Sequence, residues 1–145
     1  MYKHVLIPTD GSELSSKAEA AGLAMAKAVD AKVTALTVTA PFQFIGMDPM
    51  MFVATEPEYE KVQAARAEKA LEGVRMTAAA IGVPVETLRA VSTHPFESII
   101  ATAKERGCDL IFMASHGRSG VAGLILGSVT TKVLTHSKIP VLVYR

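Results

Sequence analysis

The sequence has one cysteine, few aromatic residues and no excess of charge of either sign. The single cysteine, Cys108, excludes an intrachain disulfide and is typical of a reducing compartment. The 15 lysines and arginines nearly balance the 14 aspartates and glutamates, so the net charge is +1. Nucleic acids and anionic membranes are bound by clustered positive charge, which this balance does not favour. We therefore expect neither as a partner.

Long hydrophobic runs are also missing. No run approaches the ~20 residues of a membrane-spanning helix. Residues 1–8 have no long apolar core followed by a cleavage site, so they predict a first strand and not a signal peptide. Half of the residues are hydrophobic and a fifth are charged, as in globular proteins. With 145 residues we expect one domain, residues 1–145, in the cytoplasm.

Strand and helix patterns alternate along the chain. Short apolar runs predict strands, and apolar residues at helical spacing predict helices. The expected strands are residues 4–7, 32–38, 83–91, 109–113 and 140–144, and the expected helices are residues 12–29, 55–80, 93–107 and 128–136. Right-handed crossovers then give an α/β fold: a doubly wound, five-stranded parallel sheet with helices on both faces, as in Rossmann-like proteins.

The glycine-rich segment of residues 114–128 lies between an expected buried strand and an expected helix. It holds Gly117, Gly120, Gly123 and Gly127. Glycine leaves the backbone N–H groups accessible and permits φ > 0. A helix N-terminus adds free amides and the positive end of its dipole, so the segment predicts a phosphate-binding loop. A connection that binds no ligand is the alternative.

The segment is neither a P-loop nor a dinucleotide fingerprint, because no Gly-Lys-Ser/Thr follows the glycines and their spacing differs. Ligands of doubly wound sheets bind beyond the carboxyl ends of strands, at the switch point. The loop of residues 8–12 and the segment 114–128 should therefore meet there. A phosphate chain would be held by backbone amides, one hydroxyl and one charged side chain, from Gly117, Arg118, Gly127, Ser128, Val129 and Thr130.

These residues resemble the universal stress protein family. Its ATP-binding members carry Gly-x2-Gly-x9-Gly-Ser/Thr, and this chain has Ala114-x2-Gly117-x9-Gly127-Ser128. The segments 7–12, 36–38 and 138–143 are also similar to the family, so the resemblance covers the whole chain. The chain departs from the motif at Ala114, where a methyl group resists φ > 0.

The resemblance implies an adenine-nucleotide alpha-hydrolase-like fold and an ATP-binding protein that acts as a nucleotide-responsive homodimer in stress adaptation. Mg²⁺ or Mn²⁺ would accompany the ATP, with no metal ligand assigned. Asp10 would face the adenosine, and Val38 would offer backbone groups to the adenine. The candidate nucleotide contacts are Pro8, Thr9, Asp10, Val38, Met113, Ala114, His116, Gly117, Arg118, Gly120, Gly127, Ser128, Val129 and Thr130.

Several roles stay open from the residues alone. Asp10 precedes Gly-Ser and fits a turn former or a helix N-cap as well as a ligand contact. His116 fits an exposed loop residue better than a phosphate contact. No residue is an evident general base, so efficient ATP hydrolysis is not expected. A slow metal-dependent ATPase and a nucleotide-free dimeric interaction protein are the alternative functions.

The strand of residues 140–144 ends the expected sheet with apolar side chains. An edge strand has unpaired backbone groups, and a second copy of the chain can cover them. We expect a homodimer through this strand, with an edge shielded by charge as the alternative.

Overall fold

The computed structural model describes residues 1–42, 55–118, 120 and 125–145, so Gly123 lies outside the described residues. The order of elements confirms the predicted alternation, and the boundaries agree within one or two residues. The elements are β1 (His4–Pro8), α1 (Glu13–Ala28), β2 (Lys32–Thr39), α2 (Glu56–Ile81), β3 (Val85–Val91), α3 (Pro95–Glu105), β4 (Leu110–Ala114), α4 (Ser128–His136) and β5 (Val141–Tyr144).

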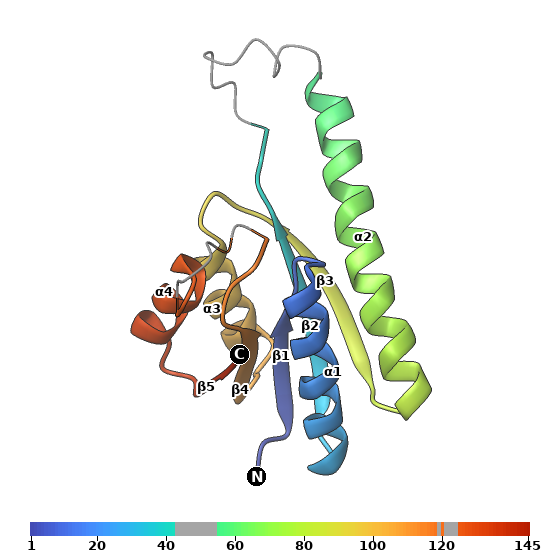
Figure 1. Ribbon diagram of the computed structural model, residues 1–145, viewed down its shortest axis with the longest axis vertical. Helices are drawn as coiled ribbons and strands as arrows, with labels where there is room; N and C mark the ends of the chain where they lie inside the picture. Colours follow the sequence, from blue (N-terminus) through green and yellow to red (C-terminus); the bar gives the residue numbers. More distant parts are fainter. Residues whose placement is uncertain (43–54, 119, 121–124) are drawn as a thin grey trace.

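The five strands form one parallel sheet in the order β3-β2-β1-β4-β5 (Figure 1). The chain builds the sheet outward from β1 to β3 and then returns to β4 on the other side of β1. The switch point therefore lies between β1 and β4, where Val5 pairs with Leu110 and Leu6 with Ile111.

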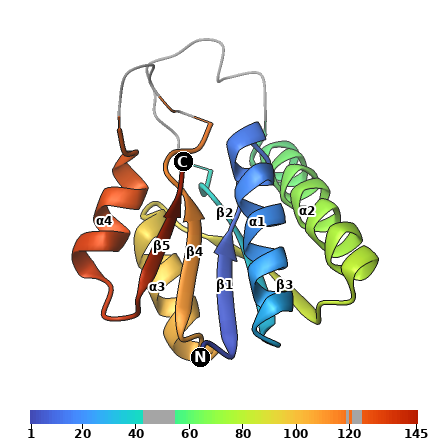
Figure 2. The ribbon, with the colours of Figure 1, turned by 60° about the horizontal axis from the view of Figure 1, so that its bottom comes forward.

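Helices cover both faces of the sheet, as predicted (Figure 2). Successive strand residues point to opposite faces. Val5 and Ile7 of β1 belong to the core cluster under α1 and α2, whereas Leu6 belongs to the cluster that includes Ile99 of α3 and Val133 of α4. Burial on both faces explains why the central strands β1 and β4 are nearly continuous apolar runs. None of the described helices is long and apolar enough to cross a membrane.

The predicted helix ends are confirmed by their hydrogen bonds. The Ser12 hydroxyl caps α1 by accepting from the Ser15 amide at 3.3 Å. Thr55 and Glu58 form a complete capping box at the start of α2. Gly82 ends α2 with φ +73°, in the left-handed region that glycine tolerates best. Local sequence signals therefore set the start of α1 and both ends of α2, whereas α3 and α4 begin without a side-chain cap among the described residues.

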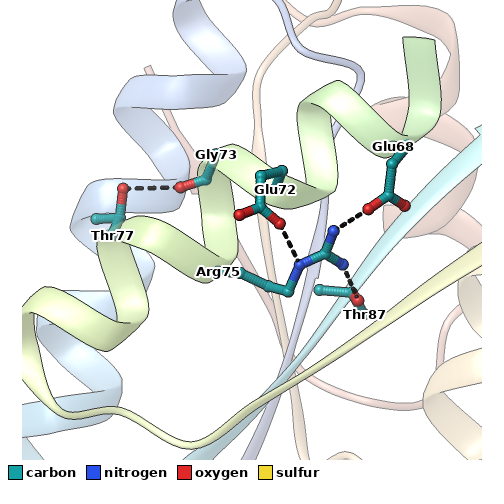
Figure 3. A network of polar contacts seen from close by, with 6 residues as sticks. All are labelled: Glu68, Glu72, Gly73, Arg75, Thr77 and Thr87. Carbon is teal, nitrogen blue, oxygen red and sulfur yellow. Dashed lines mark hydrogen bonds and ion pairs between the residues drawn. The ribbon is translucent and has the colours of Figure 1, made fainter. Parts of the chain in front are cut away.

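Arg75 is the centre of a polar network that joins α2 to the edge strand β3 (Figure 3). Its Nε donates to Glu72 Oε2 at 2.7 Å, its Nη1 donates to Thr87 Oγ1 at 2.6 Å, and its Nη2 pairs with Glu68. The strand β3 itself carries the charged residues Glu86 and Arg89, whereas β5 at the opposite edge consists of Val-Leu-Val-Tyr. Charge on an edge strand discourages pairing with another chain, so the two edges differ in this respect.

Candidate functional site

A pocket of about 400 Å³ lies at the carboxyl ends of β1 and β4, the position predicted for a ligand. Its volume is within the usual range of small-molecule sites. The lining comes from the ends of β1, β2 and β4, the first turns of α1, α3 and α4, and the glycine-rich segment: Pro8, Thr9, Asp10, Ser15, Leu36, Val38, Pro95, Ile99, Met113, Ala114, His116, Gly117, Gly120, Gly127, Ser128, Val129 and Thr130.

The structure brings every candidate contact except Arg118 to this pocket. Four lining residues were missed: Ser15, Leu36, Pro95 and Ile99. One of them carried a signal in the sequence. Leu36 is two residues from the candidate Val38 on one strand, and therefore on the same face of the sheet.

Asp10 joins the two loops of the pocket. Its Oδ1 accepts from the Ser12 amide at 2.9 Å, and its Oδ2 accepts from the Arg118 amide at 2.8 Å. The first bond makes Asp10 a turn former, whereas the N-cap of α1 is Ser12. Arg118 also donates from Nε to the Asp10 carbonyl oxygen at 2.7 Å. Its side chain is therefore held by the β1–α1 loop, which explains why it does not line the pocket.

The described glycines of the pocket provide space and do not adopt a left-handed φ. Among the described residues, positive φ occurs at Gly11, Gly82 and Gly107 and, outside glycine, at Asp30. A Cβ on Gly117 would overlap the Asp10 carboxylate, so the absence of a side chain lets the two loops meet. Ala114 needs no left-handed turn, because it is the last residue of β4.

The N-terminus of α4 opens into the pocket without a side-chain cap among the described residues. Its position is fixed by two bonds to the end of β4: Gly127 N donates to Ser115 O at 2.7 Å, and Thr130 Oγ1 donates to Ala114 O at 3.0 Å. The amides of Ser128 and Val129 belong to the first turn, where no intrahelical acceptor exists. Together with the helix dipole they make a site for an anion.

His116 is half-buried and lines the pocket, which differs from the expected exposed residue. Its Nδ1 lies 3.1 Å from Ser115 Oγ. Cβ atoms built on Gly120 and Gly127 would meet its side chain. Gly120 therefore leaves room for the ring, and Gly127 leaves room for the Cβ of His116.

Thr9, Ser15 and Glu19 form a buried polar cluster behind the β1 wall of the pocket, 5%, 3% and 8% exposed respectively. The Thr9 hydroxyl donates to Glu19 Oε1, and the Ser15 hydroxyl donates to Thr9 Oγ1 at 2.8 Å. Burial raises the pKa of Glu19, opposed by the Thr9 and Ser15 hydrogen bonds and assisted by the charge of Asp10. Sequence reasoning missed Glu19, although its position one turn after Ser15 places both residues on one helix face.

The arrangement is suited to holding a ligand with an anionic end. One end of the pocket presents the amides of α4, and the other presents apolar side chains such as Leu36 and Val38 beside the polar β1 loop. Within residues 1–42, 55–118, 120 and 125–145, no group of three or more His, Cys, Asp or Glu side chains gathers as a metal site. A cation bound here would therefore take most of its ligands from the bound molecule and from water.

Comparison with known proteins matches the whole chain. The model of the universal stress protein family matches residues 1–145. Universal stress protein YxiE of Bacillus subtilis is 34% identical over the full length of both chains. The structure of the universal stress protein UspA from Lactobacillus plantarum has a TM-score of 0.84 at 25% identity, with 99% of this chain and 98% of that one covered. A universal stress protein in complex with cAMP has a TM-score of 0.74 at 28% identity, covering 99% and 97%.

Proposed function

Because this chain belongs to the universal stress protein family, we propose that it binds an adenine nucleotide, ATP, in the pocket between β1 and β4. The observation that carries the proposal is the open first turn of α4 at one end of a cavity of about 400 Å³. The similar protein that was solved with cAMP supports a nucleotide as the ligand class. The family motif ending in Gly127-Ser128 favours ATP within this class.

The phosphates lie at the N-terminus of α4 in this proposal, with the amides of Ser128 and Val129 as donors. The adenosine lies toward Asp10 and Val38, both of which line the other part of the pocket. Ala114 is compatible with binding, because its backbone is the extended end of β4. This removes the main reason for preferring a protein that binds no nucleotide.

Mg²⁺ or Mn²⁺ accompanies the ATP in this proposal. Mg²⁺ in nucleotide sites typically binds phosphate oxygens, water and one or two protein ligands. The Ser128 hydroxyl, which lines the pocket at the N-terminus of α4, is chemically suited to such a role. When bound, the cation would neutralise phosphate charge. The protein itself binds and orients the nucleotide, and we assign no residue as a general base for hydrolysis.

The proposal includes a homodimer through β5 that works in the cytoplasm in stress adaptation. The difference in charge between the two edge strands of the sheet supports the dimer. The strand β3 is flanked by ion pairs such as Arg106–Glu86 at 2.6 Å. The strand β5 is uncharged, and its Leu142 is 38% exposed. Sedimentation of Leu142→Lys tests it, with Leu134→Lys as a control because Leu134 of α4 is 41% exposed. Only Leu142→Lys should give monomers.

A thermal melting series with ATP and Mg²⁺ tests the nucleotide proposal. Ligand at about 100 times its Kd adds roughly 2.7 kcal/mol to the free energy of unfolding. For a chain of this size the midpoint then rises by about 5–10 °C. Variants of Ser128 change the proposed site itself and cannot serve as controls for folding. The control is Glu13→Gln, on the exposed face of α1. No shift at millimolar ATP contradicts the proposal, and metal-dependent ADP release well above background favours an ATPase.

A further inference from the structure

Thr37 and Arg89 place polar side chains on the face of the sheet that α1 and α2 cover. Thr37 of β2 is paired with Arg89 of β3 in the parallel ladder. Successive strand residues point to opposite faces, and Ala35, two residues before Thr37, belongs to the core cluster under α1 and α2. The Thr37 side chain therefore points into this covered layer and away from the sheet face of Leu36 and Val38, which line the pocket.

Two polar atoms of this pair are buried without a hydrogen-bond partner. Among the described residues, they are the hydroxyl oxygen of Thr37 and Nη2 of Arg89. Thr37 is only 5% exposed, so its hydroxyl has no access to bulk water. A buried polar group without a partner destabilises the folded state, and two of them on paired residues indicate a bound molecule between them.

The other nitrogens of Arg89 hold its guanidinium against β2. Its Nε donates to Thr39 Oγ1 at 3.0 Å, and its Nη1 donates to Glu60 Oε1 of α2 at 2.6 Å. Thr39 is two residues from Thr37 and therefore on the same face of β2. Because the guanidinium is planar and rigid, these two bonds also fix Nη2, which is covered by the surrounding protein.

The chemistry and spacing of the two atoms fit a water molecule. An arginine N–H only donates, whereas a threonine hydroxyl both donates and accepts. Paired strands lie ~4.8 Å apart. A molecule with two hydrogen bonds of about 2.8 Å spans up to about 5.6 Å, so one water can reach both residues. Buried waters are typically held by about two to four such polar groups.

The charges around this pair disfavour an anion. The positive charge of Arg89 is already paired with Glu60. The Thr9 amide continues the β1–β2 pairing, which puts Thr9 beside Thr37 on the same face. The Thr9 hydroxyl donates to Glu19, a buried carboxyl group that takes part in none of the ion pairs of the described residues. An anion would lie one strand away from this group, so a neutral molecule is favoured.

We propose that one water molecule is bound between β2 and β3, where it accepts from Arg89 Nη2 and is hydrogen-bonded to the Thr37 hydroxyl. The water satisfies both buried atoms. It also completes the hydrogen bonds through which Arg89 connects α2 to the sheet. This site lies in the layer under α1 and α2, and the inference does not depend on the proposed nucleotide site.

A crystal structure that resolves ordered water is the direct test. One water within about 3.2 Å of both Thr37 Oγ1 and Arg89 Nη2 is expected. The inference is wrong if this place holds no molecule, if the two side chains bond directly, or if a third side chain bonds to both of them. It is also wrong if a crystal soaked in sodium bromide shows an anomalous bromide peak there, because the site would then take an anion.

Thr37→Val measures the same site in solution, because valine keeps the shape of threonine and lacks the hydroxyl. If the hydroxyl is bonded to water, this bond is lost and the midpoint of thermal unfolding falls by about 2–4 °C. If the hydroxyl has no partner, its removal leaves the midpoint unchanged or raises it, which contradicts the inference. Thr39→Val is the matched control on the same face of β2. Its hydroxyl accepts directly from Arg89, so its midpoint should fall with or without a water.

Arg89→Met tests whether the water connects the two residues. Methionine removes Nη2, and the Glu60 side chain, which is 48% exposed, stays hydrated without its partner. The water then has one partner fewer, so Thr37→Val should lower the midpoint by less in this background than in wild type. An equal fall in both backgrounds would show that the hydroxyl and the guanidinium act independently, and the proposed bridge would not exist.

Discussion

Gly117→Ala is expected to separate the two loops that form the mouth of the pocket. A Cβ at this position would lie 3.2 Å from Asp10 Cγ and would overlap the carboxylate oxygen beside it. The carboxylate must then turn away or the loop must shift. Either movement breaks the 2.8 Å hydrogen bond from the Arg118 amide to Asp10 Oδ2. The substitution therefore acts through Asp10 and not through the backbone conformation of Gly117.

The expected cost is the value of one hydrogen bond to a charged, half-exposed acceptor, about 1–2 kcal/mol. Thermal unfolding should then begin earlier, with a midpoint lower by about 2–8 °C for a chain of this size. If the same contact sets the shape of the nucleotide site, ATP affinity falls by about 5- to 30-fold. Differential scanning calorimetry and ATP titration measure the two effects.

A control and a double mutant decide the mechanism. Gly73→Ala adds a methyl group with no heavy atom within 4 Å, in the middle of α2, and should stabilise the protein by about 0.5–1 kcal/mol. Asp10→Ala removes the carboxylate that Gly117→Ala meets, so Gly117→Ala should cost little in that background. The reasoning is refuted if Gly117→Ala matches wild type in both assays, or if its cost is the same with and without Asp10.

Three further predictions concern other positions. Burial raises the pKa of Glu19, so between the ordinary pKa of the residue and its raised value the folded protein binds more protons than the unfolded chain. The free energy of unfolding therefore falls as pH rises through this window. Urea unfolding from pH 4 to 8 should show this loss in wild type and not in Glu19→Gln. Burial raises the pKa of Cys108 to about 11, so a thiol reagent at pH 8 should label it only after unfolding, and rapid labelling of the native protein would contradict its burial. Thr130→Val removes the 3.0 Å bond to the Ala114 carbonyl and should lower the free energy of unfolding by about 1 kcal/mol, measured in urea, whereas an unchanged value would show that α4 is held without it.

Local patterns in the sequence predicted most of the architecture. The alternation of short apolar runs with helical spacing gave the order of elements, and caps such as Ser12 and Gly82 gave the helix ends. These features depend on residues only a few positions apart. The right-handed crossover rule then placed the ends of β1 and β4 side by side, so the pocket could be located before any side-chain contact was known.

The tertiary structure alone decided what the side chains around the pocket do. Arg118 was expected at the phosphates, yet it contacts Asp10, a residue 108 positions away in the chain. Gly117 lacks a side chain because of that same carboxylate, and no local pattern reports a distant neighbour. Glu19 reads as one more polar residue of a helix until the fold buries it behind Thr9. Sequence periodicity specifies which face of an element is covered, whereas the direction of a hydrogen bond depends on which side chains the packed sheet and helices bring within about 3 Å.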